Sequence, residues 1–317
     1  MSLHQEIVKT ADRIQGYINH TLIQYSPYLS KLNSGRVFLK LENTQKTGSF
    51  KFRGAISKIS SLSSQEKSKG VITASTGNHG AACSLAMSLM NVKGSIIVPK
   101  NSQTNKIDKI KLYGADIEFF GQDCIDAEMR AQTISKDSGS VFISPYNDNE
   151  IIFGQGTIGY ELEQDIDNID AVFISVGGGG LISGIGGYLK SIHNEISIFG
   201  VSPINSCVMF ESLKSGELLE IPSMPTLSDG TAGGVEKDSI TFDYCKEFID
   251  EFLTVTEDQI IEGMIGCIEK DHCLVEGAAG AAVAGYLKKA NELKGKTVVI
   301  VICGGNINFK ILKEIIR

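Results

Sequence analysis

The chain has 317 residues, of which 42% are hydrophobic and 21% are charged, and its formal net charge is −7. This composition is typical of a soluble globular protein, and the acidic balance leaves no basic stripe to neutralise nucleic-acid phosphates. Glycines interrupt the long apolar stretches, so none could span a bilayer, and the first residues lack the basic-then-apolar order of a signal peptide. We therefore expect neither a nucleic-acid partner nor a membrane partner.

Cysteines and histidines are scattered along the chain. Five histidines and seven cysteines occur, without a Cys-x-x-Cys spacing; the cysteines are Cys83, Cys124, Cys207, Cys245, Cys267, Cys273 and Cys303. Such a pattern is typical of reduced thiols in a cytoplasm and not of a disulfide framework or a zinc site. The sequence therefore predicts a cytoplasmic protein without a metal centre.

Short β-type runs alternate with helical patterns. In chain order, "GVITAS" (70–75) precedes a helix predicted over 78–90, and "GSIIVP" (94–99) precedes one over 105–112. Further predicted strands are "ADIEFFG", "SVFISP", "DAVFISV", "ISIFGVS" and "KTVVIVIC", and a later helix is predicted to be capped at Thr256. Because several runs are apolar on both faces, we predict an α/β fold with parallel sheets covered by helices. The segments 145–149 and 215–234 are the predicted connections or lobe boundaries.

Lys51 is unusual within "KTGSFKFRGA" (46–55), because its neighbours are small or apolar. With Ser49 as the predicted N-cap, Lys51 falls in the first turn of a helix whose core face carries Phe52, Ile56 and Ile59. The electropositive helix end and the apolar surroundings both favour a neutral amine. A neutral amine can form a Schiff base with an aldehyde. The alternative is a solvated lysine beside a helix start.

Glycines dominate "SVGGGGLISG" (175–184), which follows an apolar strand and leads into a helix. Here glycines would let backbone N–H groups close around an anion at a helix N-terminus. The spacing matches neither the Walker pattern nor the dinucleotide pattern, so it indicates a phosphate rather than a nucleotide. A flexible turn is the alternative.

Two further stretches carry polar groups at strand ends. "ASTGNHG" (74–80) offers hydroxyls, amides and a carboxamide at a helix start, which suits a carboxylate, although these residues are also ordinary caps. A buried strand from Thr297 ends on Cys303 before a glycine turn; its thiol is either a small hydrophobe or a weak partner for a ring nitrogen. A nucleophilic lysine, a phosphate loop, a carboxylate site and this thiol together fit pyridoxal phosphate bound to an α-amino acid.

Over nearly its whole length the sequence resembles the fold-type II pyridoxal-phosphate enzymes, specifically the serine/threonine dehydratase and serine racemase family. "SFKFRGA" resembles the lysine motif, which implies that Lys51 carries the cofactor as a Schiff base and that Phe50 packs beside its ring. "STGNHG" resembles the asparagine loop, so Asn78 would contact the phenolic oxygen of the cofactor.

The resemblance implies roles for several other residues. "GGGGL" resembles the phosphate loop, formed by Gly177, Gly178, Gly179 and Gly180. Cys303 falls where the family has a residue beside the pyridine nitrogen, and Gly230 and Glu276 fall on positions near the cofactor. The substrate would be held by Ser75, Thr76, Asn78 and His79.

The resemblance also implies an architecture. It predicts two open, mostly parallel sheets, with a large lobe from 1–62 and 147–317 and a small lobe from 63–146 that carries the asparagine loop. Closure of the small lobe would exclude water from the substrate. A homodimer is expected from the family alone. Since the sequence ends at Arg317, directly after the catalytic unit, we expect no regulatory domain and no feedback control by isoleucine.

Two positions depart from the racemase branch of the family. Thr76 lies where that branch has a serine that acts as second acid/base, and Ser202 and Val208 lie where its divalent-cation site has carboxylates. These departures predict that no metal is bound. The stretches "ASTGNHGAA", "SPYNDNEIIFGQGTIG" and "ICGGN" are similar to those of bacterial dehydratases of the hydroxyectoine-utilisation type.

The resulting hypothesis is β-elimination of water from a hydroxy-amino acid such as L-threonine or L-serine, which yields a 2-oxo acid and ammonia. Lys51 would remove the Cα proton as general base, and the ring of the cofactor would hold the resulting charge. Three alternatives stay open. They are racemisation of serine with Lys51 and Thr76 on opposite faces of Cα, dehydration of 3-hydroxyaspartate or a hydroxyectoine-derived substrate, and a catalytically idle sensor of an amino acid or cofactor.

Overall fold

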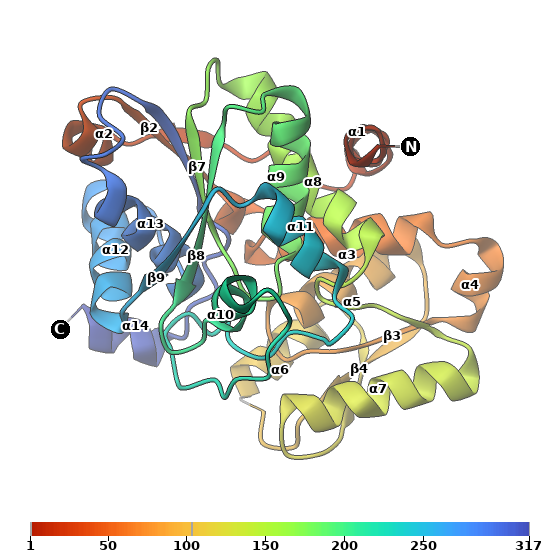
Figure 1. The fold of residues 1–317 in the computed structure, drawn as a ribbon. Helices are drawn as coiled ribbons and strands as arrows, with labels where there is room; N and C mark the ends of the chain where they lie inside the picture. Colours follow the sequence, from red (N-terminus) through yellow and green to blue (C-terminus); the bar gives the residue numbers. More distant parts are fainter. Residues whose placement is uncertain (1, 103, 317) are drawn as a thin grey trace.

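The computed structural model describes residues 2–102 and 104–316 and contains two open sheets (Figure 1). The large sheet has six strands in the order β1-β2-β10-β7-β8-β9, and the small sheet has four in the order β5-β4-β3-β6. All neighbouring strands are parallel except β1, which runs antiparallel to β2. The α/β fold with two mostly parallel sheets is therefore confirmed.

The strands occupy these ranges in chain order: β1 (Ile23–Tyr25), β2 (Arg36–Lys40), β3 (Val71–Ala74), β4 (Gly94–Val98), β5 (Asp116–Phe119), β6 (Val141–Phe142), β7 (Ala171–Ser175), β8 (Ser197–Pro203), β9 (Glu251–Val255) and β10 (Thr297–Val301). The sequence runs predicted as strands all coincide with strands of the structure. The central strands β7 and β10 are buried along their whole length, which is why they read as continuous apolar runs and not as alternating ones.

The helices occupy these ranges: α1 (Leu3–Ile14), α2 (Pro27–Asn33), α3 (Lys51–Ser61), α4 (Ser64–Lys69), α5 (Asn78–Met90), α6 (Thr104–Leu112), α7 (Cys124–Ser138), α8 (Asn149–Asp165), α9 (Gly180–Ile192), α10 (Val208–Ser215), α11 (Ile240–Phe248), α12 (Glu257–Lys270), α13 (Gly277–Lys289) and α14 (Phe309–Ile315). Two 3-10 turns, η1 (Glu42–Thr44) and η2 (Lys46–Gly48), precede α3. Thr256 caps α12 in a capping box with Gln259, as predicted.

Helices cover both faces of the large sheet. Figure 1 shows α12 and α13 on one side of β7 and β8, and α8 and α9 on the other. Helix α3 packs against both α8 and α5. Its apolar residues Phe52, Ile56 and Ile59 are buried, and they belong to the same core cluster as Val71 of β3 and Ile96 of β4. The helix that begins with Lys51 therefore connects the two sheets.

No helix within the described part of the chain is both long and apolar enough to cross a membrane. All seven cysteines are free thiols.

Candidate active site

Lys51 is the first residue of α3, in the helical turn where the sequence predicted it. Its Nζ donates a 2.9 Å hydrogen bond to the carbonyl oxygen of Pro145 and lies 5.2 Å from the ring centroid of Phe50. Burial lowers the pKa of Lys51 to about 8, because the ammonium loses its hydration. About a tenth of such an amine is neutral at pH 7. The structure thus holds a nucleophilic amine at this position.

The prediction that Ser49 caps α3 was wrong. Phe50 is the N-cap, and Ser49 has an extended backbone, with φ −162° and ψ 161°. Ser49 instead forms an antiparallel bridge with Gly304, and the backbone N–H of Phe50 donates to the carbonyl oxygen of Cys303 at 3.0 Å. Pairing with the end of the large sheet therefore overrides the local capping preference of serine. It also brings the start of α3 beside Cys303.

Cys303 is buried directly after β10. The Oγ of Ser175 donates to its Sγ at 3.4 Å. Burial raises the pKa of the Cys303 thiol, and the charges of Glu276 and Lys51 act on it from nearby. The thiol is therefore neutral around pH 7 and lies in the same cluster as the lysine.

Asn78 begins α5, and Glu276 is the N-cap residue of α13. The Nδ2 of Asn78 donates to both carboxylate oxygens of Glu276, at 2.9 and 3.1 Å. Burial raises the pKa of the Glu276 carboxyl, and its backbone N–H donates to the carbonyl oxygen of Gly304 at 3.0 Å. A Cβ at Gly304 would lie 2.6 Å from this carboxylate, so the close approach requires glycine.

Two residues without a predicted role complete this cluster. The Nδ2 of Asn306 donates to the Oδ1 of Asn78 at 2.6 Å, and its backbone N–H donates to the Oε2 of Glu276 at 3.0 Å. Lys109, on α6, donates to the Oδ1 of Asn306. The sequence offered one signal for Asn306, its place at the end of "ICGGN", and none for Lys109, because only the fold brings α6 here.

The other predicted substrate residues lie around the turn between β3 and α5. Ser75 and Thr76 are half-buried, and the Oγ of Ser75 accepts from the backbone N–H of Gly77 at 3.2 Å. The ring of His79 is buried, and its Nε2 lies 3.1 Å from the Oγ1 of Thr73 and 3.2 Å from the carbonyl oxygen of Ile143. Burial lowers the pKa of His79 to about 3. The neutral ring is therefore held in the interior by these two contacts.

The glycine loop runs from the end of β7 into α9. Gly179 has φ +85°, a left-handed conformation that favours glycine. A Cβ at Gly178 would overlap the ring of Tyr146, and one at Gly177 would lie 2.7 Å from the carbonyl oxygen of Thr231. Tyr146 directly follows Pro145, the acceptor of the Lys51 hydrogen bond. The segment 145–146 thus connects the lysine with the glycine loop, a role that the sequence did not predict.

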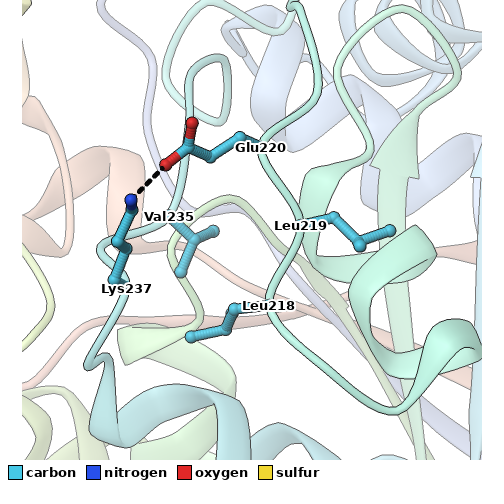
Figure 2. Close-up of a pocket in the computed structure, with 5 residues that line it drawn as sticks. All are labelled: Leu218, Leu219, Glu220, Val235 and Lys237. Carbon is cyan, nitrogen blue, oxygen red and sulfur yellow. Dashed lines mark ion pairs between the residues drawn. The ribbon is translucent and has the colours of Figure 1, made fainter.

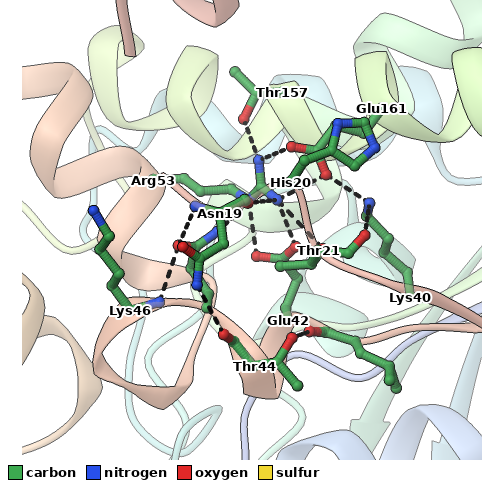
Figure 3. Close-up of polar contacts among 12 residues, drawn as sticks. Asn19, His20, Thr21, Lys40, Glu42, Thr44, Lys46, Arg53, Thr157 and Glu161 are labelled. Atoms are coloured by element: carbon green, nitrogen blue, oxygen red, sulfur yellow. Dashed lines mark hydrogen bonds and ion pairs between the residues drawn. The ribbon is translucent and has the colours of Figure 1, made fainter. Parts of the chain in front are cut away.

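A charged cluster surrounds Arg53, which follows Lys51 by two residues on α3 (Figure 3). The guanidinium of Arg53 is fully buried and binds both carboxylate oxygens of Glu42, at 2.7 and 2.8 Å, and both of Glu161, at 2.6 and 2.9 Å. The Nζ of Lys40, also fully buried, donates to Glu161 at 2.5 Å. A further bond to Thr157 at 3.1 Å completes the five N–H donors of the guanidinium. This cluster joins β2, η1, α3 and α8 next to Lys51.

A family profile described as "Pyridoxal-phosphate dependent enzyme" matches residues 14–304. The chain belongs to this family. It is 38% identical over 313 residues to L-threonine ammonia-lyase of Thermotoga maritima, covering 98% of this chain and 78% of the relative. It superimposes with a TM-score of 0.94 on the processed threonine deaminase isoform 2 of Solanum lycopersicum, with 32% identity over 99% of this chain and 87% of that one. For maize serine racemase the TM-score is 0.93, with 29% identity over 99% of this chain and 96% of that one.

The cofactor of this pyridoxal-phosphate-dependent enzyme is consistent with the groups at the site. Across the described residues, the backbone N–H groups at 177–180 have no acceptor within the protein, although most buried amides in proteins are paired. Four such donors at a helix N-terminus suit a phosphate. Lys51 supplies an amine for the aldehyde group, and Cys303 supplies a neutral group within the same cluster.

The positions considered for a divalent cation carry no carboxylate. The Oγ of Ser202 donates to the carbonyl oxygen of Val176 at 2.7 Å, and Val208 is buried in α10. Within the described ranges, no group of three or more histidine, cysteine, aspartate or glutamate side chains could hold a metal ion.

A surface pocket of about 480 Å³ lies elsewhere on the chain (Figure 2). Its lining residues, none of which is a predicted site residue, are Leu218, Leu219, Glu220, Val235 and Lys237. The exposed ion pair between Lys237 and Glu220, at 3.0 Å, provides its charges. Because solvent screens this pair and the other side chains are aliphatic, the pocket offers no catalytic chemistry.

Proposed function

We propose that this protein is an ammonia-lyase that acts on a hydroxy-amino acid such as L-threonine or L-serine and releases a 2-oxo acid and ammonia. The observation that carries the proposal is the Lys51 amine, whose pKa of about 8 leaves it partly neutral beside Phe50 and Cys303. The Thermotoga maritima relative, by its name an L-threonine ammonia-lyase, supports threonine as a substrate.

Lys51 would hold the cofactor covalently through its Nζ, and the same amine, when free, would remove the Cα proton of the substrate. Pyridoxal phosphate, when bound, supplies a conjugated ring that takes up the charge left at Cα. The β-hydroxyl leaves as water once it has accepted a proton. Water returns when the released enamine, through its imine tautomer, hydrolyses to the 2-oxo acid and ammonia, so the net reaction consumes no water.

The proposed cofactor site uses groups from both ends of the chain. The backbone N–H groups of the glycine loop hold the phosphate; the loop is formed by Gly177, Gly178, Gly179 and Gly180. Phe50 would pack beside the ring, and Asn78 would donate to the phenolic oxygen. Cys303 would lie beside the ring nitrogen as a neutral group, which the raised pKa of its thiol supports. Gly230 leaves space near Glu276.

The proposed substrate site is the N-terminus of α5. The substrate carboxylate would be held by the side chains or backbone N–H groups of Ser75, Thr76, Asn78 and His79, because a helix N-terminus favours an anion. For His79 we propose the backbone N–H alone, since its ring is bonded to Thr73 and Ile143.

A racemase is the second candidate, favoured by the similarity to maize serine racemase. In that reaction Lys51 and Thr76 would exchange protons with opposite faces of Cα. The half-buried hydroxyl of Thr76 is the group proposed for the second face. A Thr76→Ala variant should then lose racemisation before it loses elimination.

The test is release of 2-oxo acid from L-threonine, L-serine and 3-hydroxyaspartate, with pyridoxal phosphate supplied and no metal added. Chiral analysis of the recovered serine runs in parallel. Release from threonine or serine without D-serine supports the ammonia-lyase. Formation of D-serine without 2-oxo acid would replace it with the racemase, and silence across the panel in cofactor-loaded protein would reject both.

We propose a small lobe over 63–146 and a large lobe from the remainder; the small sheet, which lies entirely within 71–142, supports this division. Helix α3 contacts both proposed lobes, because Phe52 and Ile56 pack into the core of the small sheet. A homodimer in the cytoplasm is proposed from the family and from the free thiols.

A further inference from the structure

Helix α6 follows β4 of the small sheet. Two of its lysines contact segments that lie beside the large sheet. Lys106 forms an ion pair with Asp229 at 3.0 Å. Lys109 donates to the carbonyl oxygen of Thr47 at 2.8 Å and to the Oδ1 of Asn306. The two contacts differ in their surroundings. Asp229 is largely exposed, whereas Lys109 is partly desolvated, which lowers its pKa, and its acceptor Asn306 reaches into the candidate active site.

Lys109 determines which way the carboxamide of Asn306 points. An ammonium can only donate hydrogen bonds, so the oxygen of the Asn306 side chain must face it. The Nδ2 of Asn306 is then directed at two acceptors, the carbonyl oxygen of Thr47 at 2.8 Å and the Oδ1 of Asn78 at 2.6 Å. A reversed carboxamide would place an NH₂ group against the ammonium and lose both bonds.

The orientation passes from Asn306 to Asn78. Because the Oδ1 of Asn78 accepts from Asn306, its Nδ2 faces Glu276 and donates to both carboxylate oxygens. One ammonium therefore sets the polarity of two carboxamides in series. The Nδ2 of Asn78 carries two N–H groups, and the one not directed at the Glu276 carboxylate is the donor proposed for the phenolic oxygen of the cofactor.

The backbone around this contact is shaped to allow it. Thr47 has φ +68°, a left-handed conformation that is uncommon for a β-branched residue, and its carbonyl oxygen accepts from both Lys109 and Asn306. A Cβ at Gly48 would lie 2.6 Å from the Oδ1 of Asn306. Such strain persists where the surrounding contacts determine it and is common at functional sites.

We propose that Lys109 is a positioning residue that orients Asn306, and through it the carboxamide of Asn78, toward the cofactor. This proposal rests on the proposed role of Asn78. Lys109 touches neither Asn78 nor any reacting atom in this arrangement; it acts through the hydrogen-bond chain. Lys109 reaches from α6 to η2 and Asn306. The series of hydrogen bonds is therefore complete only while α6 lies against these segments.

The experiment compares the holoenzyme with three single variants. Lys109→Met removes the donors and keeps most of the aliphatic stem, Lys109→Arg keeps a donor, and Lys106→Met removes the neighbouring lysine as a matched control. The readouts are kcat, KM, the absorption spectrum of the bound cofactor and the rate at which the cofactor is lost on dialysis. Thermal unfolding of each variant reports on the fold separately.

We expect Lys109→Met to lower kcat by about tenfold or more, to shift the spectrum and to speed cofactor loss, since a charge-assisted hydrogen bond is lost. Lys109→Arg should recover most of this loss, and Lys106→Met should stay within about twofold of the wild type in kcat, because an exposed pair contributes little. Equal behaviour of Lys109→Met and Lys106→Met in all four readouts would overturn the proposal.

An Asn306→Ala variant tests the route. If Lys109 acts through Asn306, adding Lys109→Met to Asn306→Ala should change kcat and cofactor loss little further. Additive effects would mean that Lys109 acts by another path, and would also overturn the proposal. Failure of the proposed function is separable: a wild type silent on every substrate rejects the ammonia-lyase, while cofactor loss and the spectrum still test Lys109.

Discussion

Lys51 and Arg53 stand two residues apart on α3, yet their side chains enter different clusters. Since a helix turns by about 100° per residue, the two side chains leave it on nearly opposite sides. Arg53 enters a closed cluster in which all five guanidinium N–H groups meet acceptors, mainly the carboxylates of Glu42 and Glu161. Lys51 meets one carbonyl oxygen, that of Pro145, in a region with a neutral thiol and unpaired backbone amides.

The difference separates structural charge from reactive charge. A buried ion cluster with every donor satisfied holds its charges in one protonation state and fixes the elements around it. An amine with few partners and little hydration can lose its proton near physiological pH. The same helix start thus has a rigid support on one side and a reactive group on the other.

The largest expected effect is a loss of activity when Lys51 is replaced. Lys51→Ala should lower 2-oxo acid release by at least about 10³-fold, because the amine that attaches the cofactor and moves the proton is gone. The unfolding midpoint of the apo-protein should change little, since Lys51 is half-buried and makes one hydrogen bond. A Lys51→Ala protein that keeps normal turnover would show that Lys51 is not the reactive group.

The next effect concerns stability. Arg53→Met should lower the free energy of unfolding by about 3–5 kcal/mol. Among the described residues, Glu42 would lose its only charged partner and Glu161 one of two. Denaturant unfolding measures the change in free energy. The control is Arg130→Met, which breaks the exposed pair with Glu118 and should cost at most about 1 kcal/mol. Equal stabilities of the two variants would contradict a structural role for the Arg53 cluster.

A third prediction uses pH. In the apo-protein, Lys51 is an ammonium below its pKa of about 8 and a neutral amine above it. Its rate of acetylation by acetic anhydride, corrected for hydrolysis of the reagent, should therefore rise with pH and level off above about 8. Mass spectrometry of the peptide that contains Lys51 gives the profile, and prior addition of pyridoxal phosphate should protect it. A rate still climbing steadily between pH 9 and 10 would show that burial does not lower this pKa.

The smallest effect concerns Cys303. Cys303→Ser exchanges one neutral group for another and should change kcat/KM by no more than about threefold. Cys303→Asp would place a carboxylate in a buried site near Glu276, whose charge already acts on position 303; like charges there oppose ionisation. It should lower kcat/KM far more than the serine variant does. Equal activity of the serine and aspartate variants would argue against a requirement for a neutral group.

Local patterns in the sequence predicted much of this molecule. The alternation of apolar runs and helical patterns identified the strands and the helix Asn78–Met90, and the spacing of Thr256 and Gln259 identified a cap. Lys51 was placed in the first turn of its helix from a predicted cap at Ser49, and it lies in that turn although Phe50 is the N-cap. These features depend on residues close together in sequence, where propensity and periodicity operate.

The resemblance to a family predicted the two sheets, but several contacts between distant segments were not predicted. Ser49 has the chemistry of a cap, but its backbone pairs with Gly304, which lies far along the chain. Lys109 meets Asn306, and Asn306 meets Asn78, only after both sheets are in place. No local pattern carries that information, because Asn78, Lys109 and Asn306 are separated in the sequence and come together only in the folded protein.

The strand order has a consequence for biosynthesis. β10 lies between β2 and β7 in the large sheet, although it is the last of the described strands to be translated. Until it emerges from the ribosome, β2 and β7 lack their shared neighbour, and Cys303 and Asn306 are absent from the site. Translation proceeds at about 5–20 residues per second. The position between β2 and β7 in the large sheet therefore stays empty for many seconds. We therefore expect nascent chains that do not yet include β10 to depend on chaperones and to be unable to retain the cofactor.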